Sequence, residues 1–401
     1  MYSTSFTQLI IHSRYPLNNS HSACPRHVQK EIVSAIPEIA DDTQQYQVVT
    51  ALEELLESDT EMSVVVFDCF SQLDLIPEHA NKVTDLALEA LPSVALSDLP
   101  VVLRFLLQGS AKSSVERVVN AVRKDIELPR KPSKEESAHV ALILEALSSG
   151  LHFRSDITSA LIEELKNSPL DTPMDLYCIL VLKSRTRWKK ISSQIFRKKL
   201  CRNGRTSLGK WIKRAISGHG KSVQSHYMTL LELAEGLLLG RNASCHAVGR
   251  KLYCLLFQEF QDNSQRQQLI GNLITHSGSG NSMEIDSALD ALLTLSKDEK
   301  SLLPFAVFVK GTLDFLSGFS LSQIRTVYDI ICALTLYEYS QNTPDSEDKN
   351  NNNNREGDLD ELVILLNKNL AKEDSNSNVR TEQNLSRFHN AKKKYTKMTI
   401  V

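Results

Sequence analysis

Apolar residues recur at helical spacing through most of this chain, and this pattern restricts the fold more than any other feature. Two clear instances are Val48, Leu52, Leu55 and Leu56, and Val83, Leu86, Ala87, Ala90 and Leu91. Residues three, four and seven positions apart lie on one face of a helix, so each segment presents one apolar stripe. Proline and glycine interrupt the pattern and keep the segments short. The one Asn-Gly pair, Asn203-Gly204, has no alternating strand beside it. The pattern predicts an all-α protein.

Short helices with one apolar stripe each bury that stripe well when they stack as antiparallel pairs with neighbours on both sides. The chain has 401 residues, which exceeds the roughly 250–300 residues at which a single core stops growing. No strict repeat period is visible. The predicted fold class is therefore an all-α, degenerate α-solenoid of antiparallel helix pairs over residues 26–340.

The ends of the chain depart from this pattern. Residues 1–25 are predicted to be a poorly ordered start. Residues 341–358 have almost no apolar side chain to bury and are predicted to be a disordered Asn-rich linker. One short amphipathic helix is predicted at 359–371. The remaining residues, 372–401, are polar, basic and aperiodic, which is typical of a disordered tail.

Composition narrows the classes of protein. Hydrophobic residues make up 41% of the chain, charged residues 23%, and the net charge is −2, so the chain as a whole does not attract nucleic acid or membrane. No apolar run approaches the ~20 residues that span a bilayer, and the N-terminus has no secretory pattern. Seven widely spaced cysteines without a C-x-x-C motif are typical of reduced, intracellular thiols.

Residues that could bind a metal or carry out catalysis form no convincing group. His21, Cys24 and His27 lie three residues apart, but a structural zinc site needs four ligands and no second cluster is near. Cys245 and Cys254 are interpreted as buried thiols. The histidines lie in no nucleophile or loop signature. We therefore predict no metal site, no cofactor, no small-molecule substrate and no catalytic residues, and hence a protein that is not an enzyme.

Charge is segregated along the chain. The stretch from Leu176 to Leu231, named the basic window, contains 14 Lys and Arg residues and no Asp or Glu. Subtracting these 14 charges from the net charge of −2 leaves −16 for the rest of the chain. Trp188, Phe196 and Trp211 alternate with the cations, as in surfaces that neutralise phosphates and contact bases or sugars.

Nine of these cations are the candidate DNA-binding or partner-binding residues. They are Lys189, Lys190, Arg197, Lys198, Lys199, Arg202, Lys210, Lys213 and Arg214. The sequence leaves three interpretations open. The window contacts nucleic acid, or it forms one half of an interface with an acidic protein, or it is a solvated helix face whose long side chains cover apolar surface.

The segment from Gly204 to Lys210 has the G-x-x-x-x-G-K spacing of a phosphate-binding loop. The next residue is Trp211, where the motif needs a hydroxyl to hold Mg²⁺, and a basic helix is predicted where the motif needs a strand. We interpret the segment as a turn between two helices.

Four further stretches resemble a known family. They are Gly271-Asn272-Leu273-Ile274-Thr275-His276 followed by Glu284-Ile285-Asp286-Ser287-Ala288-Leu289, then Ala306-Val307-Phe308-Val309-Lys310-Gly311-Thr312-Leu313-Asp314-Phe315-Leu316, and, earlier, His27-Val28-Gln29-Lys30-Glu31-Ile32-Val33. In order and spacing they resemble the Fanconi anaemia group D-two family, large helical proteins of DNA interstrand crosslink repair. The resemblance extends from near Arg26 to near Tyr339. Within the basic window, Trp188-Lys189-Lys190 resembles a basic helix of the family.

The resemblance implies a HEAT-like curvature, nuclear localisation and two binding partners. These are a paralogous helical protein, the Fanconi anaemia group I protein, and double-stranded DNA, which the pair clamps in the family. A single ubiquitin on one lysine locks that clamp. The matching position here falls near Asn376, where there is no lysine, and the flanks of the nearest lysine, Lys372, do not match. We therefore identify no ubiquitin acceptor, which argues against ubiquitin machinery as a partner. Because the family protein is several times longer, the chain is interpreted as a shortened form that lacks the N-terminal part and the large C-terminal part.

Together these observations predict a nuclear, non-catalytic helical scaffold of DNA interstrand crosslink repair that binds the group I-type paralogue and duplex DNA. The alternative is a protein-only scaffold whose basic window docks an acidic partner. No membrane contact is expected.

Overall fold

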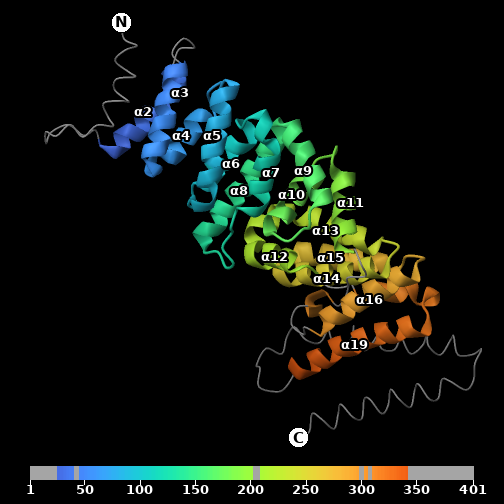
Figure 1. Ribbon diagram of the computed structural model, residues 1–401. Coiled ribbons are helices and arrows are strands. Elements are labelled where there is room, and N and C mark those ends of the chain that lie inside the picture. Colours follow the sequence, from blue (N-terminus) through green and yellow to red (C-terminus); the bar gives the residue numbers. More distant parts are fainter. Residues whose placement is uncertain (1–24, 40–44, 202–207, 298–301, 306–308, 342–401) are drawn as a thin grey trace, which may run out of the picture. The chain divides into compact units, whose positions relative to one another are not determined.

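The computed structural model describes residues 25–39, 45–201, 208–297, 302–305 and 309–341 (Figure 1). Within these ranges all regular structure is helical and no strand occurs. The prediction of an all-α solenoid is therefore confirmed. Residues 1–24 and 342–401, which hold nearly all of the predicted start, linker, short helix and tail, lie outside the described residues. No helix in the described ranges combines the length and the apolar character that a bilayer-spanning segment needs.

The helices divide into two compact units, one up to Leu233 and one from Ala234 onward, and the division falls inside helix α13 (Tyr227–Leu238). The α-helices that precede α13 are α2 (Arg26–Ile39), α3 (Gln45–Ser58), α4 (Ser63–Phe70), α5 (Pro77–Ala90), α6 (Leu99–Gln108), α7 (Val115–Lys124), α8 (Lys134–Phe153), α9 (Ser155–Asn167), α10 (Pro173–Ser184), α11 (Lys189–Leu200) and α12 (Lys210–Val223).

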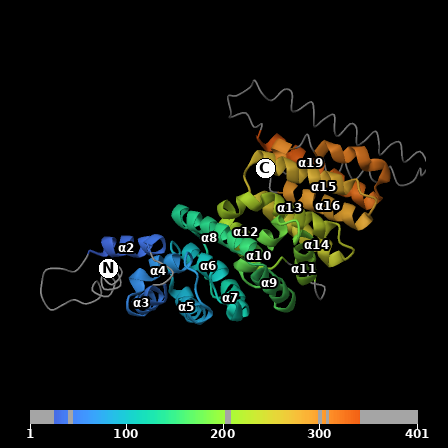
Figure 2. The same cartoon turned by 90° about the horizontal axis from the view of Figure 1, so that it is seen from above.

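The helices of the first unit form two rows (Figure 2). In one row α2 packs on α4, α4 on α6, α6 on α8 and α8 on α12, while in the other α7 packs on α9 and α9 on α11. Helices of one pair therefore contact helices of the next pair along each row, which is the arrangement of stacked helix pairs. The apolar stripe predicted at Val83 and Ala87 is fully buried by this stacking.

Helix α10 is enclosed by α7, α8, α11 and α12. A capping box begins it, in which Asp175 N donates to Thr172 Oγ1 at 3.3 Å and Thr172 N donates to Asp175 Oδ2 at 3.1 Å. All ten residues from Met174 to Lys183 are buried. Because α10 has no solvent-exposed face, the cations that solvent can reach in the basic window lie mainly on α11 and α12.

A buried ionic network joins α10 to α7 and α9. Arg123 on α7 is 1% exposed. Its guanidinium donates to Asp175 Oδ1 at 2.7 Å, to Glu164 Oε1 at 2.9 Å and to the Pro169 carbonyl at 3.1 Å. The second carboxylate oxygen of Asp175 accepts two backbone N–H groups from the turn before α10. Buried charges are stable only when they are paired and hydrogen-bonded in this way, so the network holds α10 in place.

Among the described residues, the second unit contains the remainder of α13 and four further named α-helices. They are α14 (Ala243–Glu259), α15 (Asn263–Ser277), α16 (Ser282–Ser296) and α19 (Leu321–Gln341), with the 3-10 helix η8 (Lys310–Gly318) before α19. Asn242, Asp262 and Asn281 cap α14, α15 and α16 through their side-chain oxygens. Helix α16 packs against α14, α15 and α19.

Candidate nucleic-acid interface

Helix α11 places its apolar and basic residues on different faces. Ile195 and Phe196 are buried, and the helix packs on α10. Lys190, Arg197 and Lys198 are exposed. Arg197 and Lys198 follow Lys190 by seven and eight residues, so the three side chains share one stripe. The cations of the last turn are also favoured by the helix dipole, whereas Lys190 in the first turn gains nothing from it.

Helix α12 repeats this separation. Ile212, Ala215 and Ile216 are fully buried, while Lys210, Lys213 and Arg214 are exposed. The apolar residues set which side of α12 faces the core, and the cations occupy the opposite side. Six of the nine predicted residues are exposed on these two helices and have no ion pair among the described residues, and they are named the bare cations. They are Lys190, Arg197, Lys198, Lys210, Lys213 and Arg214.

The bare cations have no acidic partner within 4.0 Å in the part of the chain that the structure describes. Both helices pack on α10, and the rings of Phe196 and Trp211 connect them at a centroid distance of 6.4 Å. The bare cations thus lie on two helices that share one support. Arg202, another of the predicted residues, lies outside the described ranges.

Two of the predicted binding residues have structural contacts. Lys189 Nζ lies 2.9 Å from Glu232 Oε2 on α13, and the buried Lys183 lies 3.1 Å from the same oxygen. Partial burial raises the pKa of Glu232, but the hydrogen bonds from Lys189 and Lys183 outweigh that effect and hold the pKa below its usual value. Lys199 Nζ donates to the Ser168 carbonyl at 2.6 Å and so caps the end of α9.

The aromatic residues of the window do not form a surface for stacking. Phe196 and Trp211 are buried, and their rings meet edge to face at an interplanar angle of 84°. The interpretation of these two side chains as contacts to bases is wrong, because they belong to the apolar stripes of α11 and α12. Trp188 is half-buried, and the Arg187 guanidinium lies 4.6 Å from its ring centroid.

The G-x-x-x-x-G-K segment is bounded by helices. Helix α11 precedes it and α12 begins directly after Gly209. A phosphate-binding loop requires a strand in the position of α11. Residues 204–207 themselves lie outside the described ranges.

Helix α12 is kinked at His219, whose φ and ψ are −129° and 30°. The imidazole is 3% exposed and packs edge to face against Tyr177 of α10 at a centroid distance of 6.3 Å. Burial lowers the pKa of His219, because the charged imidazolium is poorly solvated there.

Acid should therefore weaken the packing of α12. Below the unfolded value of 6.5, the unfolded chain binds a proton at His219 that the folded chain resists, so stability is lost as the pH falls. The loss from this one group is at most about 1.4 kcal/mol per pH unit. Urea unfolding of the wild-type chain and of His219→Gln between pH 7 and pH 5 measures it. The variant should lose less stability on acidification, and equal losses for both proteins would contradict the assignment.

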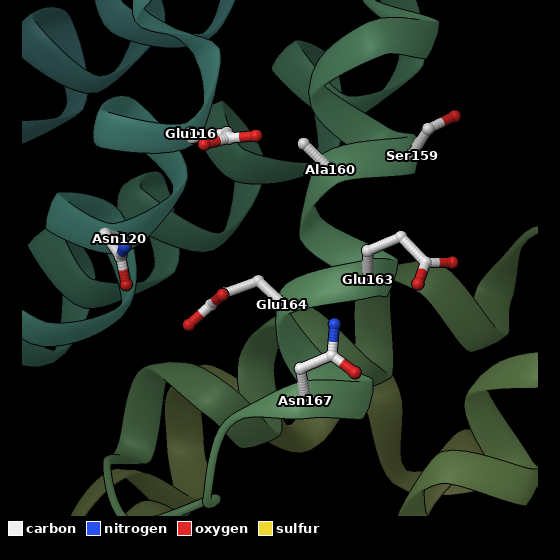
Figure 3. A pocket seen from close by; sticks show the side chains of 7 residues that line it. All are labelled: Glu116, Asn120, Ser159, Ala160, Glu163, Glu164 and Asn167. Atoms are coloured by element: carbon white, nitrogen blue, oxygen red, sulfur yellow. The ribbon is translucent and has the colours of Figure 1, made fainter.

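A hollow of about 400 Å³ lies between α7 and α9 (Figure 3). It is lined by Glu116, Asn120, Ser159, Ala160, Glu163, Glu164 and Asn167. Two of its carboxylates already have cationic partners, Glu164 with Arg123 at 2.9 Å and Glu163 with Lys166 at 2.6 Å. Within the described ranges no three His, Cys, Asp or Glu side chains are placed to hold a metal ion.

Five of the cysteines have the properties of core residues. Cys69, Cys178, Cys201, Cys245 and Cys254 are free and buried. Burial raises the thiol pKa of Cys69 and Cys178 to about 12 and that of Cys254 to about 11. Such thiols are protonated at neutral pH and react slowly. His21 and Cys24, considered above as metal ligands, lie outside the described residues.

Reasoning from the sequence missed the roles of Glu232 and Lys183. Glu232 is the first acidic residue after the basic window. From the sequence it only marked the end of the window and was not recognised as an ion-pair partner. Lys183 looked like one more cation of the window, although it is 6% exposed and paired. The available signal was its position directly after the apolar run Ile179 to Leu182, which predicts burial on all sides of the helix.

Comparison with known proteins identifies the family. The model of the family described as Fanconi anaemia protein FancD2 nuclease matches residues 17–351. This chain belongs to the FancD2 family. The Fanconi anemia group D2 protein of Gallus gallus is 28% identical over 346 residues, which are 78% of this chain and 24% of that protein. The Fanconi anemia group D2 protein homologs of Mus musculus and Rattus norvegicus are 28% and 27% identical over 349 residues.

The family match confirms the resemblance seen in the sequence between Arg26 and Tyr339. The chain spans about a quarter of the length of these FancD2 relatives, since the matched part is 24% of each. The family description contains the word nuclease. Two of the three carboxylates that line the α7–α9 hollow, Glu163 and Glu164, are engaged with Lys166 and Arg123.

Proposed function

We propose that the chain is a non-catalytic scaffold of the Fanconi anaemia pathway in DNA interstrand crosslink repair, and that α11 and α12 hold duplex DNA by its phosphates. Membership of the FancD2 family supports the pathway. The observation that supports DNA contact is the set of six bare cations, which are exposed and lack acidic partners among the described residues.

Phosphate contact requires cations that the protein has not already neutralised. Each bare cation that replaces the counterions condensed on duplex DNA contributes a salt-dependent gain in affinity and carries no sequence information. The burial of Phe196 and Trp211 removes their rings from any contact with bases. The interface therefore fits the DNA backbone and not a particular base sequence.

The family resemblance adds a partner and a location. The scaffold would bind a paralogous helical protein of the Fanconi anaemia group I type and act in the nucleus. Stacked helix pairs expose long continuous surfaces that suit such a partner. Asn376 and Lys372, which bear on ubiquitin attachment, lie outside the described residues, and no acceptor is proposed.

A protein-only scaffold is the second candidate, and the contacts of Glu232 favour it. This carboxylate already pairs with Lys183 and Lys189, so cations of the basic window can accept an acidic protein group. In that case an acidic surface of the partner would cover the bare cations, and the chain would not contact DNA.

Two labelled duplexes of equal length and unrelated sequence distinguish the candidates. Contacts to phosphates alone predict that both duplexes bind with dissociation constants equal within about twofold, because the backbone is the same in each. Fluorescence anisotropy at about 50 mM salt measures both constants. Binding of the group I-type paralogue without binding of either duplex would reject the proposal in favour of the protein-only scaffold.

A further inference from the structure

The turn that joins α7 to α8 lies across helix α12. A Cβ added at Gly218 of α12 would lie 3.0 Å from the carbonyl oxygen of Arg130. One turn further along α12, Ser222 Oγ donates to the carbonyl oxygen of Ser137 at 2.7 Å. These two contacts fix the segment 130–137 against the C-terminal half of α12, and α8 continues to pack on α12 beyond it.

The hydrogen bond from Ser222 to the Ser137 carbonyl places the Ser137 face of α8 beside α12. This orientation determines which other side chains at the start of α8 lie near α12. Lys134 precedes Ser137 by three residues and therefore shares its face. Glu135 is two residues from Ser137 and lies about 160° away around the helix. Glu136 is turned back to accept the Ser133 N–H at 2.7 Å as part of the capping box. Of these three charged side chains, the cation is the one on the side of α12.

On α12 the same two contacts are bordered by cations. Arg214 lies one turn before Gly218, and Lys221 lies next to Ser222. Both are exposed, as are Arg130, Lys131 and Lys134. We name these five side chains the crossing patch. None has an acidic partner within 4.0 Å among the residues that the structure describes.

We propose that the crossing patch binds the phosphate backbone of duplex nucleic acid and extends the interface of α12 onto the turn between α7 and α8. This inference rests on the proposed function. Lys210 and Lys221 are eleven residues apart, which corresponds to about 16 Å along a helix and to the axial length of about five base pairs. Arg130, Lys131 and Lys134 lie at the Lys221 end of this row, so they lengthen the contact.

The proposal is tested with alanine at Arg130, Lys131 and Lys134 in the full chain. These substitutions leave all nine predicted window residues and the Arg130 backbone carbonyl in place. The slope of log affinity for a duplex against log salt should become shallower by about 2 to 3, at about 0.9 for each phosphate that the protein no longer neutralises. The conservative variant R130K/K131R/K134R should keep the wild-type slope. The control K30A/K112A/R241A loses the same charge at exposed positions elsewhere and should also keep it.

The outcomes separate this inference from the proposed function. An unchanged slope in the alanine variant, together with a reduced slope in K210A/K213A/R214A, would overturn the inference and leave the proposed function standing. If the unmodified chain does not bind the duplex, both the inference and the proposed function are contradicted. The alanine variant could instead lose binding to poly-glutamate while its salt slope for the duplex stays unchanged. That result would assign the crossing patch to an acidic protein and overturn the inference. Equal thermal midpoints for the variants and the wild-type chain show that the slopes compare folded proteins.

Discussion

Alanine at all six bare cations is expected to weaken duplex binding by about a thousandfold or more at about 50 mM salt, because the salt-dependent part of the affinity depends on the number of phosphates neutralised. The substituted side chains are those of Lys190, Arg197, Lys198, Lys210, Lys213 and Arg214. All six are exposed, so their truncation should leave the fold intact. Fluorescence anisotropy with a labelled duplex measures the loss.

The matched control removes six exposed cations from other places in the chain. They are Lys30, Lys82, Lys112, Arg117, Lys166 and Arg241. Both variants carry the same net charge, so a long-range effect of charge alone would weaken them equally. The proposed function predicts a large loss for the first variant and a small one for the control. Equal losses would show that α11 and α12 are not the interface.

Arg123→Met is expected to destabilise the first unit by about 3–5 kcal/mol, because it leaves a buried carboxylate without its cation. Asp175, which would lose the hydrogen bond at 2.7 Å, is fully buried at the start of α10. Urea unfolding followed by tryptophan fluorescence measures the loss. The only two tryptophans, Trp188 and Trp211, both precede Leu233, so the signal reports the first unit.

A neighbouring arginine on the same helix provides the control. Arg117 Nη1 lies 2.6 Å from Asp85 Oδ1, and both side chains are largely exposed. Arg117→Met should change the free energy of unfolding by no more than about 1 kcal/mol. The double variant R123M/D175N should recover part of the loss, since the unpaired charge is then removed. Similar costs at Arg123 and Arg117 would refute the role assigned to the network.

The fold class followed from the sequence because helical periodicity is local. The spacing of apolar residues within a segment shows which face of its helix is apolar, and Val83 and Ala87 are buried as that spacing predicted. No local sequence pattern of this kind marks the division between the two units at Leu233. It depends on contacts between helices distant in sequence, and the apolar pattern runs through α13 without interruption.

The candidate interface was predicted only in part. The exposure of Lys190, Arg197 and Lys198 agrees with helical periodicity, because Ile195 and Phe196 occupy the opposite face. The same reasoning applied to Phe196 would have predicted its burial. The composition of the window suggested stacking instead, which was the less specific argument.

Contacts between distant segments could not be predicted. Arg123 and Asp175 are 52 residues apart, and Ser137 and Ser222 are 85 residues apart. Arg123 continues the apolar stripe of Val115 and Val119, but no local pattern shows which carboxylate it pairs with. Pairing between charges of this kind is set by the stacking of helices and is visible only in three dimensions.

The salt dependence of duplex binding by the unmodified chain tests the central claim most directly. If the six bare cations neutralise phosphates, log affinity should fall with log salt at a slope of about −5, so that affinity drops about a thousandfold between about 50 and 200 mM salt. A slope near zero, or no duplex binding at low salt, would contradict the claim that α11 and α12 form a phosphate-binding surface.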